Sequence, residues 1–230
     1  MCSRYFLDAE GNVIAYTFRV PNGEKVKKRF NIAPTQEAPV VRMGAAGERE
    51  IALLRWGLVP YWAKDLKVGT KMINARSEGV AEKPAFRAAV QKRRCIVPAT
   101  GFFEWQGEAG RKQPFAITLP GAPLFAFAGL WETWKPQEGE PVQTFTIVTT
   151  DANSHVAKIH DRMPVILPMD AVDTWLTGPT DAALALLKPY EGDTSLRAVG
   201  KFVSNVNHEG PECLSDAEPT WDEPRQGSLL

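Results

Sequence analysis

The sequence predicts an α+β fold, a single domain built on a barrel-like, mixed but mainly antiparallel β-sheet with short helices packed outside it. Three observations support this prediction: many short runs of β-branched and aromatic residues, turn residues between most of them, and few segments with helical spacing. The 230 residues are 44% hydrophobic and 23% charged, which is typical of a globular chain with a substantial core. We expect one domain over residues 1–210 and a loosely held C-terminal tail over residues 211–230.

The expected strands begin with two hairpins. Residues 12–20 and 25–32 flank a Pro-Asn-Gly turn, which favours an antiparallel pair. Residues 38–43 and 49–56 flank a Gly-Ala-Ala-Gly turn and are expected to pair in the same way. The later strands are expected at residues 95–98, 102–105, 113–119, 124–131, 144–149 and 202–206.

The expected helices are short and lie between these strands. They are predicted at residues 83–91, 151–159, 171–176 and 181–187. Asp151 or Asn153 is expected to cap the second of them, because short polar side chains accept hydrogen bonds from the first helical turn. Residues 55–62 are dense in Trp, Gly and Pro, so we expect an irregular loop there.

Charge and cysteine content bear on the class of protein. Lys and Arg together number 27, as do Asp and Glu, so a nucleic-acid site has to be a local patch. The three cysteines, Cys2, Cys95 and Cys213, make neither a disulfide framework nor a metal-binding pattern, which favours a reducing cytosol. The sequence has no signal peptide and no apolar run as long as a membrane span, so we expect a cytoplasmic protein with no membrane partner.

Cys2 is the residue around which a function can be built. If Met1 is removed, Cys2 carries an α-amine and a thiol on neighbouring carbons, with pKa values of about 7.7–8.0 and about 8.5. The amine can condense with an aldehyde to a Schiff base, and the thiol can then close a five-membered thiazolidine ring. The alternative is that a cysteine after the first Met has no role.

Three further stretches carry side chains suited to chemistry. Asn74 offers a donor and an acceptor, and Arg76 offers a fork for phosphate or carboxylate. Glu104 lies among three aromatic residues, where a poorly solvated carboxyl group has a raised pKa and can donate a proton. His160 precedes a Met-Pro pair and is a natural proton shuttle. Each residue also has a structural interpretation: a turn residue, a solvated ion pair, a carboxylate that faces water, or a structural histidine.

Six short motifs occur in a fixed order: Cys2 with Arg4, NIAP at 31–34, RWGLVP at 55–60, Asn74-Ala75-Arg76 with Glu78, GFFEW at 101–105, and HDRMP at 160–164. Together they resemble the SRAP family, the SOS-response-associated peptidases or abasic-site-processing proteins, from residue 2 to about residue 213. The sequence departs from the family at Ser3, where glycine is usual. It also has a single Trp62 followed by Ala63, where some members carry two tryptophans.

The resemblance implies the SRAP fold and a protein that binds single-stranded DNA and forms a thiazolidine crosslink with abasic sites through Cys2, which shields the lesion during the DNA damage response. It implies that Asn74 positions the sugar and the amine, that Glu104 assists ring opening and Schiff-base formation, and that His160 transfers protons in strand cleavage and crosslink reversal. The DNA contacts implied by the resemblance are Arg4, Pro34, Trp62, Arg76, Thr149 and Arg162.

The resemblance further implies an abasic-site lyase activity, self-removal of Met1, and partners that comprise DNA with abasic sites and replication-fork proteins. We expect a monomer that needs no cofactor or metal and that associates with the nucleoid at damage. Two alternatives stay open from the sequence. One is a thiol peptidase or amidohydrolase that uses Cys2, Glu104 and His160, and the other is a non-enzymatic module that binds single-stranded DNA.

Overall fold

The computed structural model describes residues 2–21, 23, 26–108 and 111–218. Within these residues, five strands of one sheet close into a barrel in the order β4-β3-β6-β9-β10 and back to β4. The β4–β10 pair is parallel, and the other four pairs of the ring are antiparallel. The five strands are β3 (Glu37–Met43), β4 (Arg49–Trp56), β6 (Arg94–Ala99), β9 (Phe125–Trp134) and β10 (Val142–Asp151). The predicted mixed, mainly antiparallel barrel is therefore confirmed.

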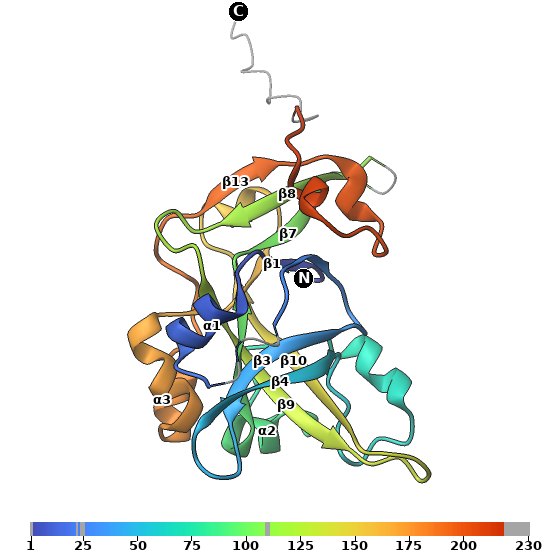
Figure 1. Cartoon of the computed structure of the whole chain (residues 1–230), viewed down its shortest axis with the longest axis vertical. Helices are drawn as coiled ribbons and strands as arrows, with labels where there is room; N and C mark the ends of the chain where they lie inside the picture. The colour runs from blue at the N-terminus through green and yellow to red at the C-terminus, as the bar shows by residue number, and fades with distance from the viewer. Residues whose placement is uncertain (1, 22, 24–25, 109–110, 219–230) are drawn as a thin grey trace, which may run out of the picture.

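A second sheet lies above the barrel in Figure 1, with strand order β13-β8-β7-β1-β2 in the described residues. Its strands are β1 (Tyr5–Leu7), β2 (Arg29–Ile32), β7 (Gly101–Gln106), β8 (Gln113–Thr118) and β13 (Ser195–Ala198). The short strand β1 has β7 on one side and β2 on the other, both antiparallel. The first strand of the chain thus lies between the next strand, β2, and the much later β7.

Three short strands extend the barrel sheet. β5 (Asn74–Arg76) pairs in parallel with β10 beyond the end of β4, and β11 (Arg162–Pro164) pairs with the last residues of β10. β12 (Ile166–Leu167) pairs with β9. The far end of β10 therefore gathers β5 and β11, which carry several of the residues expected to act on DNA.

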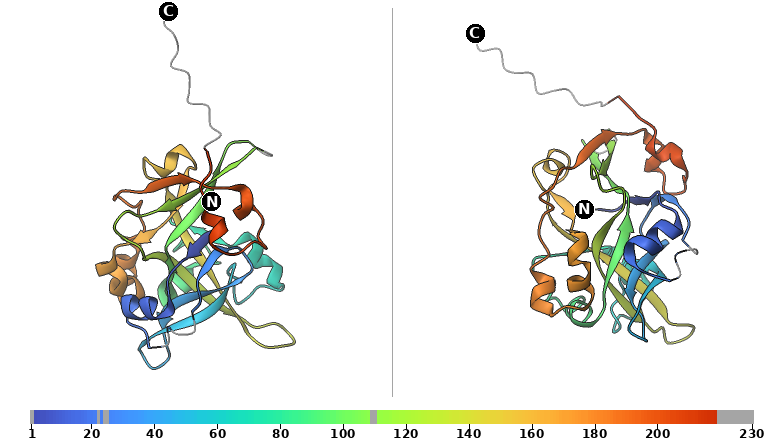
Figure 2. Two further views of the ribbon diagram at one scale, coloured as in Figure 1. Left: turned by 45° about the horizontal axis from the view of Figure 1, so that its top comes forward. Right: turned by 60° about the vertical axis from the view of Figure 1, so that its left-hand side comes forward.

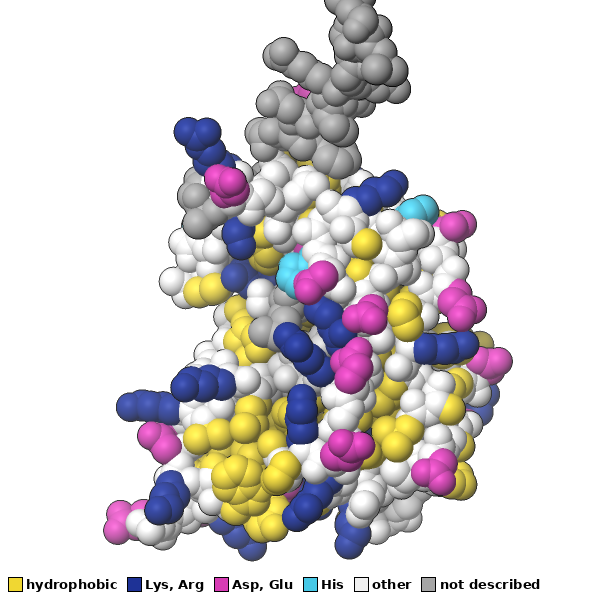
Figure 3. Space-filling model, turned by 180° about the vertical axis from the view of Figure 1, so that it is seen from behind, with side chains coloured by type: hydrophobic (Ala, Val, Ile, Leu, Met, Phe, Trp, Pro, Cys, Tyr) yellow, Lys and Arg dark blue, Asp and Glu magenta, His cyan; other side chains and the backbone are white. Residues whose placement is uncertain are grey.

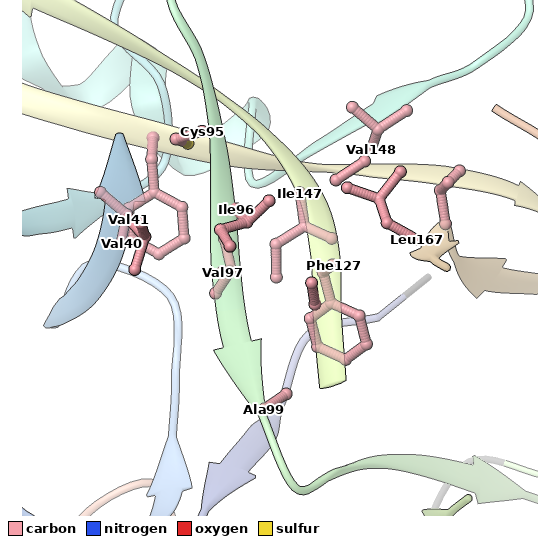
Figure 4. Packing of buried hydrophobic residues seen from close by; sticks show 14 of the residues in the cluster. Val40, Val41, Cys95, Ile96, Val97, Ala99, Phe127, Ile147, Val148 and Leu167 are labelled. Carbon is pink, nitrogen blue, oxygen red and sulfur yellow. The ribbon is translucent and has the colours of Figure 1, made fainter. Parts of the chain in front are cut away.

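The barrel is filled by side chains that alternate inward along the strands, among them Val40, Val97, Phe127 and Ile147 (Figure 4). Tyr5 enters this core from β1. Its ring packs edge-on against Trp56, with the ring centroids 5.3 Å apart, and against Phe127 at 6.0 Å. Aromatic pairs of this geometry add about 0.5–1.5 kcal/mol to the stabilisation from burial, so β1 is held by packing as well as by hydrogen bonds.

The helices are short and lie outside the two sheets (Figure 2). α2 (Arg87–Lys92) contacts β6 and β9, and α3 (Val172–Thr177) contacts β3 and β6. α1 (Gly11–Phe18) and α4 (Thr180–Leu184) complete the α-helices of the described residues. None of the helices that the structure describes combines the length and apolar character needed to cross a membrane.

The predicted N-terminal hairpin is wrong. Residues 12–20 form most of helix α1, in which Ile14 and Phe18 are buried while Val13 and Tyr16 are 46% and 89% exposed. The buried positions follow the spacing of a helix, although the segment is rich in β-branched and aromatic residues. The expected return strand is limited to β2, which pairs with β1. The expected turn includes residue 22 and the expected strand includes residue 25, and both of these residues lie outside the described residues.

Three other sequence predictions also need correction. Residues 202–206 are not a strand but contain a 3₁₀ turn, η5 (Lys201–Ser204), while the actual strand β13 ends before it. The helix expected over residues 151–159 is reduced to a single 3₁₀ turn, η3 (Val156–Lys158), because β10 continues to Asp151. The helix expected from residue 83 starts at Arg87.

The chain does not become loosely held at residue 211. A further 3₁₀ turn, η6 (Pro211–Leu214), buries Cys213 against a small apolar cluster with Phe6 and Phe103. Arg197 on β13 also forms an ion pair with Asp216. Residues 219–230 of the expected tail lie outside the described residues.

Gly101 is predicted to be essential for the contact between β1 and β7. A Cβ atom at this position would lie 2.0 Å from Cζ of Phe6 and 2.8 Å from the carbonyl oxygen of Ile117. We expect Gly101→Ala to lower the free energy of unfolding by at least about 1–3 kcal/mol, because the packed ring and the strand backbone have to move. Urea unfolding with an unchanged m-value measures this difference.

Gly200→Ala is the matched control. At Gly200 the nearest atom to a new Cβ is the Ser215 carbonyl oxygen at 3.8 Å, and the backbone has an ordinary φ of −59°. We expect its free energy of unfolding to stay within about 0.5 kcal/mol of the wild-type value. Equal stabilities for Gly101→Ala and Gly200→Ala would contradict the packing described for β1.

Candidate functional site

The pairing of β1 with β7 fixes the residues at the start of the chain. The backbone N–H of Phe103 donates to the carbonyl oxygen of Arg4 at 2.9 Å. Continuing this antiparallel register places Ser3 opposite Glu104. The carbonyl oxygen of Cys2 accepts a hydrogen bond from Nδ2 of Asn74 at 2.7 Å. Residues from positions 2, 74 and 104 are thus brought together, as the sequence predicted for three of the four proposed catalytic residues.

The Cys2 thiol is fully buried and uncharged. Its Sγ lies 3.9 Å from the carbonyl oxygen of Arg4. Burial, assisted by the negative charge of nearby Glu104, raises the pKa of the thiol far above its ordinary value. A thiolate is the nucleophilic form of cysteine, so the thiol in this setting is a poor first attacker at neutral pH. Chemistry that begins at sulfur is therefore not favoured by the geometry.

Asn74 presents a hydrogen-bond acceptor to the site. It begins β5, where its pairing with Ile147 of β10 fixes the backbone. While Nδ2 holds Cys2, Oδ1 is buried and accepts no hydrogen bond from the described residues. A buried amide oxygen without a partner costs about 1–3 kcal/mol. Such an oxygen is suited to accept from an amine or a sugar hydroxyl group.

A cavity of about 360 Å³ opens at Ser3, the residue that follows Cys2, while Cys2 itself is buried and does not line it. It brings together Arg4 from the start of the chain, Glu104 from β7 and His160 from the segment before β11. The residues that line it are Ser3, Arg4, Glu104, Trp105, Lys112, His160 and Ser204. A cavity that combines a buried carboxyl group, an imidazole and two cationic side chains is suited to acid–base chemistry on an anionic ligand.

Glu104 is only 3% exposed, and burial raises its pKa to about 7. The negative charge of Asp161 adds to this rise, and Lys112 opposes it. At neutral pH the carboxyl group is therefore divided between its protonated and ionised forms. A group in this state can donate a proton and take it back, which is the property of a general acid–base residue. This agrees with the raised pKa predicted from its aromatic neighbours.

His160 lies between η3 and β11 and is half-buried. Burial lowers the pKa of the imidazole, so the ring is mainly neutral at pH 7. Its Nδ1 accepts from the backbone N–H of Arg162 at 3.0 Å and also lies 2.9 Å from Oδ1 of Asp161. Because one neighbour is a donor and the other an acceptor, each neutral tautomer has a partner at Nδ1. Nε2 can therefore serve as donor in one tautomer and as acceptor in the other.

Arg162, an expected DNA contact, is bound by two carboxylates in this structure. Its Nη1 donates to Glu78 at 2.9 Å and to Asp151 at 2.6 Å, and its Nη2 donates to Glu78 and to the carbonyl oxygen of Thr149, both at 2.9 Å. These bonds use the four terminal N–H groups, and the two to Glu78 lower the pKa of that carboxyl group to about 2. The backbone N–H of Arg162 orients His160.

The other expected DNA contacts divide into two groups. Arg76 is exposed and forms no ion pair with another described residue, while the Trp62 side chain is 52% exposed and Pro34 is half-buried in the turn after β2. These three can reach a ligand. Thr149 is fully buried, and its Oγ1 has no hydrogen-bond partner in the described part of the chain.

Sequence reasoning missed three residues of the cavity wall. Trp105 belongs to the GFFEW motif but was assigned no role. Lys112 and Ser204 belong to no motif, so the sequence does not indicate that they line the cavity.

The described residues contain no group of three or more His, Cys, Asp or Glu that could hold a metal ion. Figure 3 shows the face of the molecule opposite to that in Figure 1. On this face Lys and Arg side chains are interspersed with Asp and Glu, in keeping with the balanced net charge.

Sequence alignments with related proteins cover most of this chain. Abasic site processing protein YoaM of Bacillus subtilis (strain 168) is 42% identical over 228 residues, which cover 95% of this chain and 99% of that protein. Abasic site processing protein HMCES of Gallus gallus is 35% identical, and the alignment covers 84% of this chain and 68% of that protein.

The fold is likewise shared with solved structures. A protein from Bacteroides thetaiotaomicron superposes with a TM-score of 0.83 at 27% identity, over 94% of this chain and 100% of that chain. A protein from Bordetella bronchiseptica superposes with a TM-score of 0.75 at 28% identity, over 86% of this chain and 100% of that chain. The family model described as SOS response associated peptidase (SRAP) matches residues 1–206. The chain therefore belongs to the SRAP family.

Proposed function

We propose that this protein, after removal of Met1, binds single-stranded DNA and forms a covalent thiazolidine crosslink between Cys2 and an abasic site, which shields the lesion. The observation that carries the proposal is the 2.7 Å hydrogen bond from Asn74 to the Cys2 carbonyl, beside a cavity that holds Glu104 and His160. The names of the related proteins, which are called abasic site processing proteins, support it.

The chemistry starts at the amine. The α-amine of Cys2 adds to the aldehyde carbon of the ring-opened sugar, and the adduct loses one water molecule to give an imine. The thiol then adds to the imine carbon, its proton passes to nitrogen, and the five-membered ring is closed. No redox partner is needed. A neutral, buried thiol suits this order, because sulfur acts only after the electrophilic carbon is bonded to the amine nitrogen of the same residue.

The neighbouring side chains have separate roles in this scheme. Oδ1 of Asn74 accepts from the amine or from a sugar hydroxyl group, since it has no other partner among the described residues. The protonated carboxyl group of Glu104 assists sugar ring opening and the loss of water from the adduct. Nε2 of His160 moves protons when the crosslink is reversed or when the strand is cleaved by elimination.

DNA binding is assigned to a local surface rather than to net charge. Arg4 in the cavity and Arg76 on the surface are proposed to meet phosphates, and Trp62 and Pro34 to stack beside unpaired bases. Base stacking on an aromatic side chain is worth about 1–3 kcal/mol per base. Because the chain carries no net charge, we expect modest affinity for intact DNA, with persistence at lesions provided by the covalent bond.

A general thiol peptidase is less well supported. The word peptidase in the family description fits the removal of Met1, whose peptide bond adjoins Cys2. Cleavage of other peptides needs an accessible thiolate, whereas this thiol is buried and neutral. We therefore propose self-processing as the proteolytic event. Incubation with a general peptide library tests the alternative, which predicts repeated cleavage and no trapping of abasic DNA.

Cys2→Ala is predicted to abolish the stable crosslink. Wild-type protein with Met1 removed should give a shifted band on a denaturing gel with single-stranded DNA that contains one abasic site. The alanine variant retains an α-amine but has no thiol to close the ring, so it should give a band only when borohydride reduces the imine. A stable band from Cys2→Ala without reductant would contradict the role of the thiol.

The pH dependence of crosslinking is predicted to be bell-shaped in the wild type. The acid limb reflects deprotonation of the amine, with a pKa of about 7.7–8.0. The alkaline limb reflects loss of the Glu104 proton, with a pKa of about 7. Single-turnover rates between pH 5.5 and 9 should show a maximum between these values. In Glu104→Gln the reaction should be slower and the alkaline limb should disappear; an unchanged profile would remove Glu104 from the mechanism.

His160→Gln is predicted to affect release more than capture. The imidazole has a partner for either tautomer and can move a proton, which glutamine cannot do. The rate of strand cleavage, and the rate at which a preformed crosslink transfers to excess competitor DNA, should each fall about 10-fold or more. Initial crosslinking should change by less than a factor of three. Equal losses in capture and release would show that His160 acts in both steps.

A further inference from the structure

Two buried arginines lie near the candidate site, and their partners differ in charge. The terminal nitrogens of Arg162 are bound by two carboxylates, as described above. Arg4 is 8% exposed, but its Nη1 donates to two neutral acceptors, Oδ1 of Asn31 and the carbonyl oxygen of Val203, both at 2.8 Å. No acidic side chain among the described residues forms a salt bridge with Arg4. Its positive charge is therefore left for a ligand.

The orientation of the Arg4 guanidinium group is fixed on several sides. Both hydrogens of Nη1 are used, and Cζ lies 5.4 Å from the ring centroid of Trp105. Nη2 has no acceptor in the described part of the chain, and the side chain lines the cavity. An arginine held in this way presents a preorganised donor to an anion and loses little side-chain entropy on binding.

Asn31 connects Arg4 to the segment of residues 201–208. Asn31 is 1% exposed and is the penultimate residue of β2, the strand next to β1. Its Nδ2 donates to the carbonyl oxygens of His208 at 2.8 Å, Asn205 at 3.0 Å and Val203 at 3.3 Å. Because these three partners can only accept, the amide orientation is determined, and Oδ1 has to face Arg4. One asparagine thus joins the arginine to the loop above it.

The segment 201–208 also supports the other wall of the cavity. Nε1 of Trp105 donates to Oγ of Ser204 at 3.2 Å. Within the segment, the rings of Phe202 and His208 stack with centroids 4.0 Å apart, and Nδ1 of His208 lies 2.8 Å from the carbonyl oxygen of Phe202. Segment 201–208 therefore contacts Arg4 in two ways. Ser204 holds the Trp105 ring that packs against Arg4, and Val203 supplies a carbonyl oxygen that Arg4 binds.

We propose that Asn31 is a positioning residue for DNA binding, and that with segment 201–208 it holds Arg4 as the anion-binding group of the cavity. This inference rests on the proposed function, since the anion is taken to be a DNA phosphate beside the abasic sugar. The phosphate contact of Arg4 belongs to the proposed function, and the new element is Asn31, which orients the guanidinium group. Asn31 acts through Arg4 and does not touch the reacting atoms.

The test measures crosslinking rate against the concentration of single-stranded DNA with one abasic site. Asn31→Ala removes one of the two acceptors of Arg4, and Asn31→Asp places a carboxylate against the guanidinium group. We expect the half-saturating DNA concentration to rise at least fivefold in Asn31→Ala and further in Asn31→Asp. The maximal rate should change by less than twofold, because the reacting groups are untouched. A loss of maximal rate with unchanged half-saturation would overturn the inference.

Gln36→Ala is the matched control. Oε1 of Gln36 accepts from Nη2 of Arg29 at 2.7 Å, and Nε2 donates to the carbonyl oxygen of Val206 at 3.5 Å. It therefore makes the same kind of link between an arginine and segment 201–208, but Arg29 does not line the cavity. We expect its half-saturating DNA concentration to match the wild-type value within twofold. An effect equal to that of Asn31→Ala would indicate general disturbance of the segment and overturn the inference.

A double-substitution cycle separates positioning from folding. In an Arg4→Ala background, Asn31→Ala should raise the half-saturating concentration by less than a further factor of two, because its target is gone. Independent multiplication of the two effects would overturn the inference, as would an Arg4→Ala variant that binds DNA like the wild type. If Asn31→Ala does not fold, as judged by urea unfolding, Asn31→Asp is used in the same cycle. A wild-type protein that forms no crosslink would instead refute the proposed function.

Discussion

The docking of β1 between β7 and β2 is the constraint on which the rest of the site depends. β1 has only three residues, yet Tyr5 reaches the aromatic core of the barrel and the carbonyl of Arg4 is bound by β7. The few residues before β1 then have little conformational freedom. Asn74 fixes the carbonyl of Cys2, and Glu104 lies across the strand from Ser3. The first residues of most chains are poorly ordered, whereas here Cys2 is part of the core.

Burial determines the protonation states of Cys2 and of the ionisable groups around it. The same exclusion of water keeps the Cys2 thiol neutral, brings the pKa of Glu104 to about 7 and favours the neutral imidazole of His160. These three effects suit one sequence of events, in which an amine attacks, a carboxyl group supplies a proton and sulfur closes the ring. The two buried arginines near the site differ in their partners: Arg162 is paired with carboxylates, whereas Arg4 donates to neutral oxygens.

Much of this could be predicted from the sequence, and the failures have physical causes. The barrel strands were predictable because β-branched runs such as residues 144–149 leave no other packing for their side chains. Helix α1 was not, because its local propensity favours a strand and tertiary packing decides otherwise. Sequence motifs identified Cys2, Asn74 and Glu104, but burial of Thr149, neutralisation of Arg162 and the approach of Ser204 depend on contacts between distant segments.

The most direct test of the account identifies the atoms that hold the DNA. Crosslinked protein is digested with nuclease and protease, treated with iodoacetamide and analysed by mass spectrometry. The account predicts an N-terminal peptide without Met1 that carries the sugar remnant on Cys2, with one water lost and with neither amine nor thiol open to modification. A remnant on Lys112 or another lysine, or a crosslinked Cys2 whose thiol is still alkylated, would contradict it.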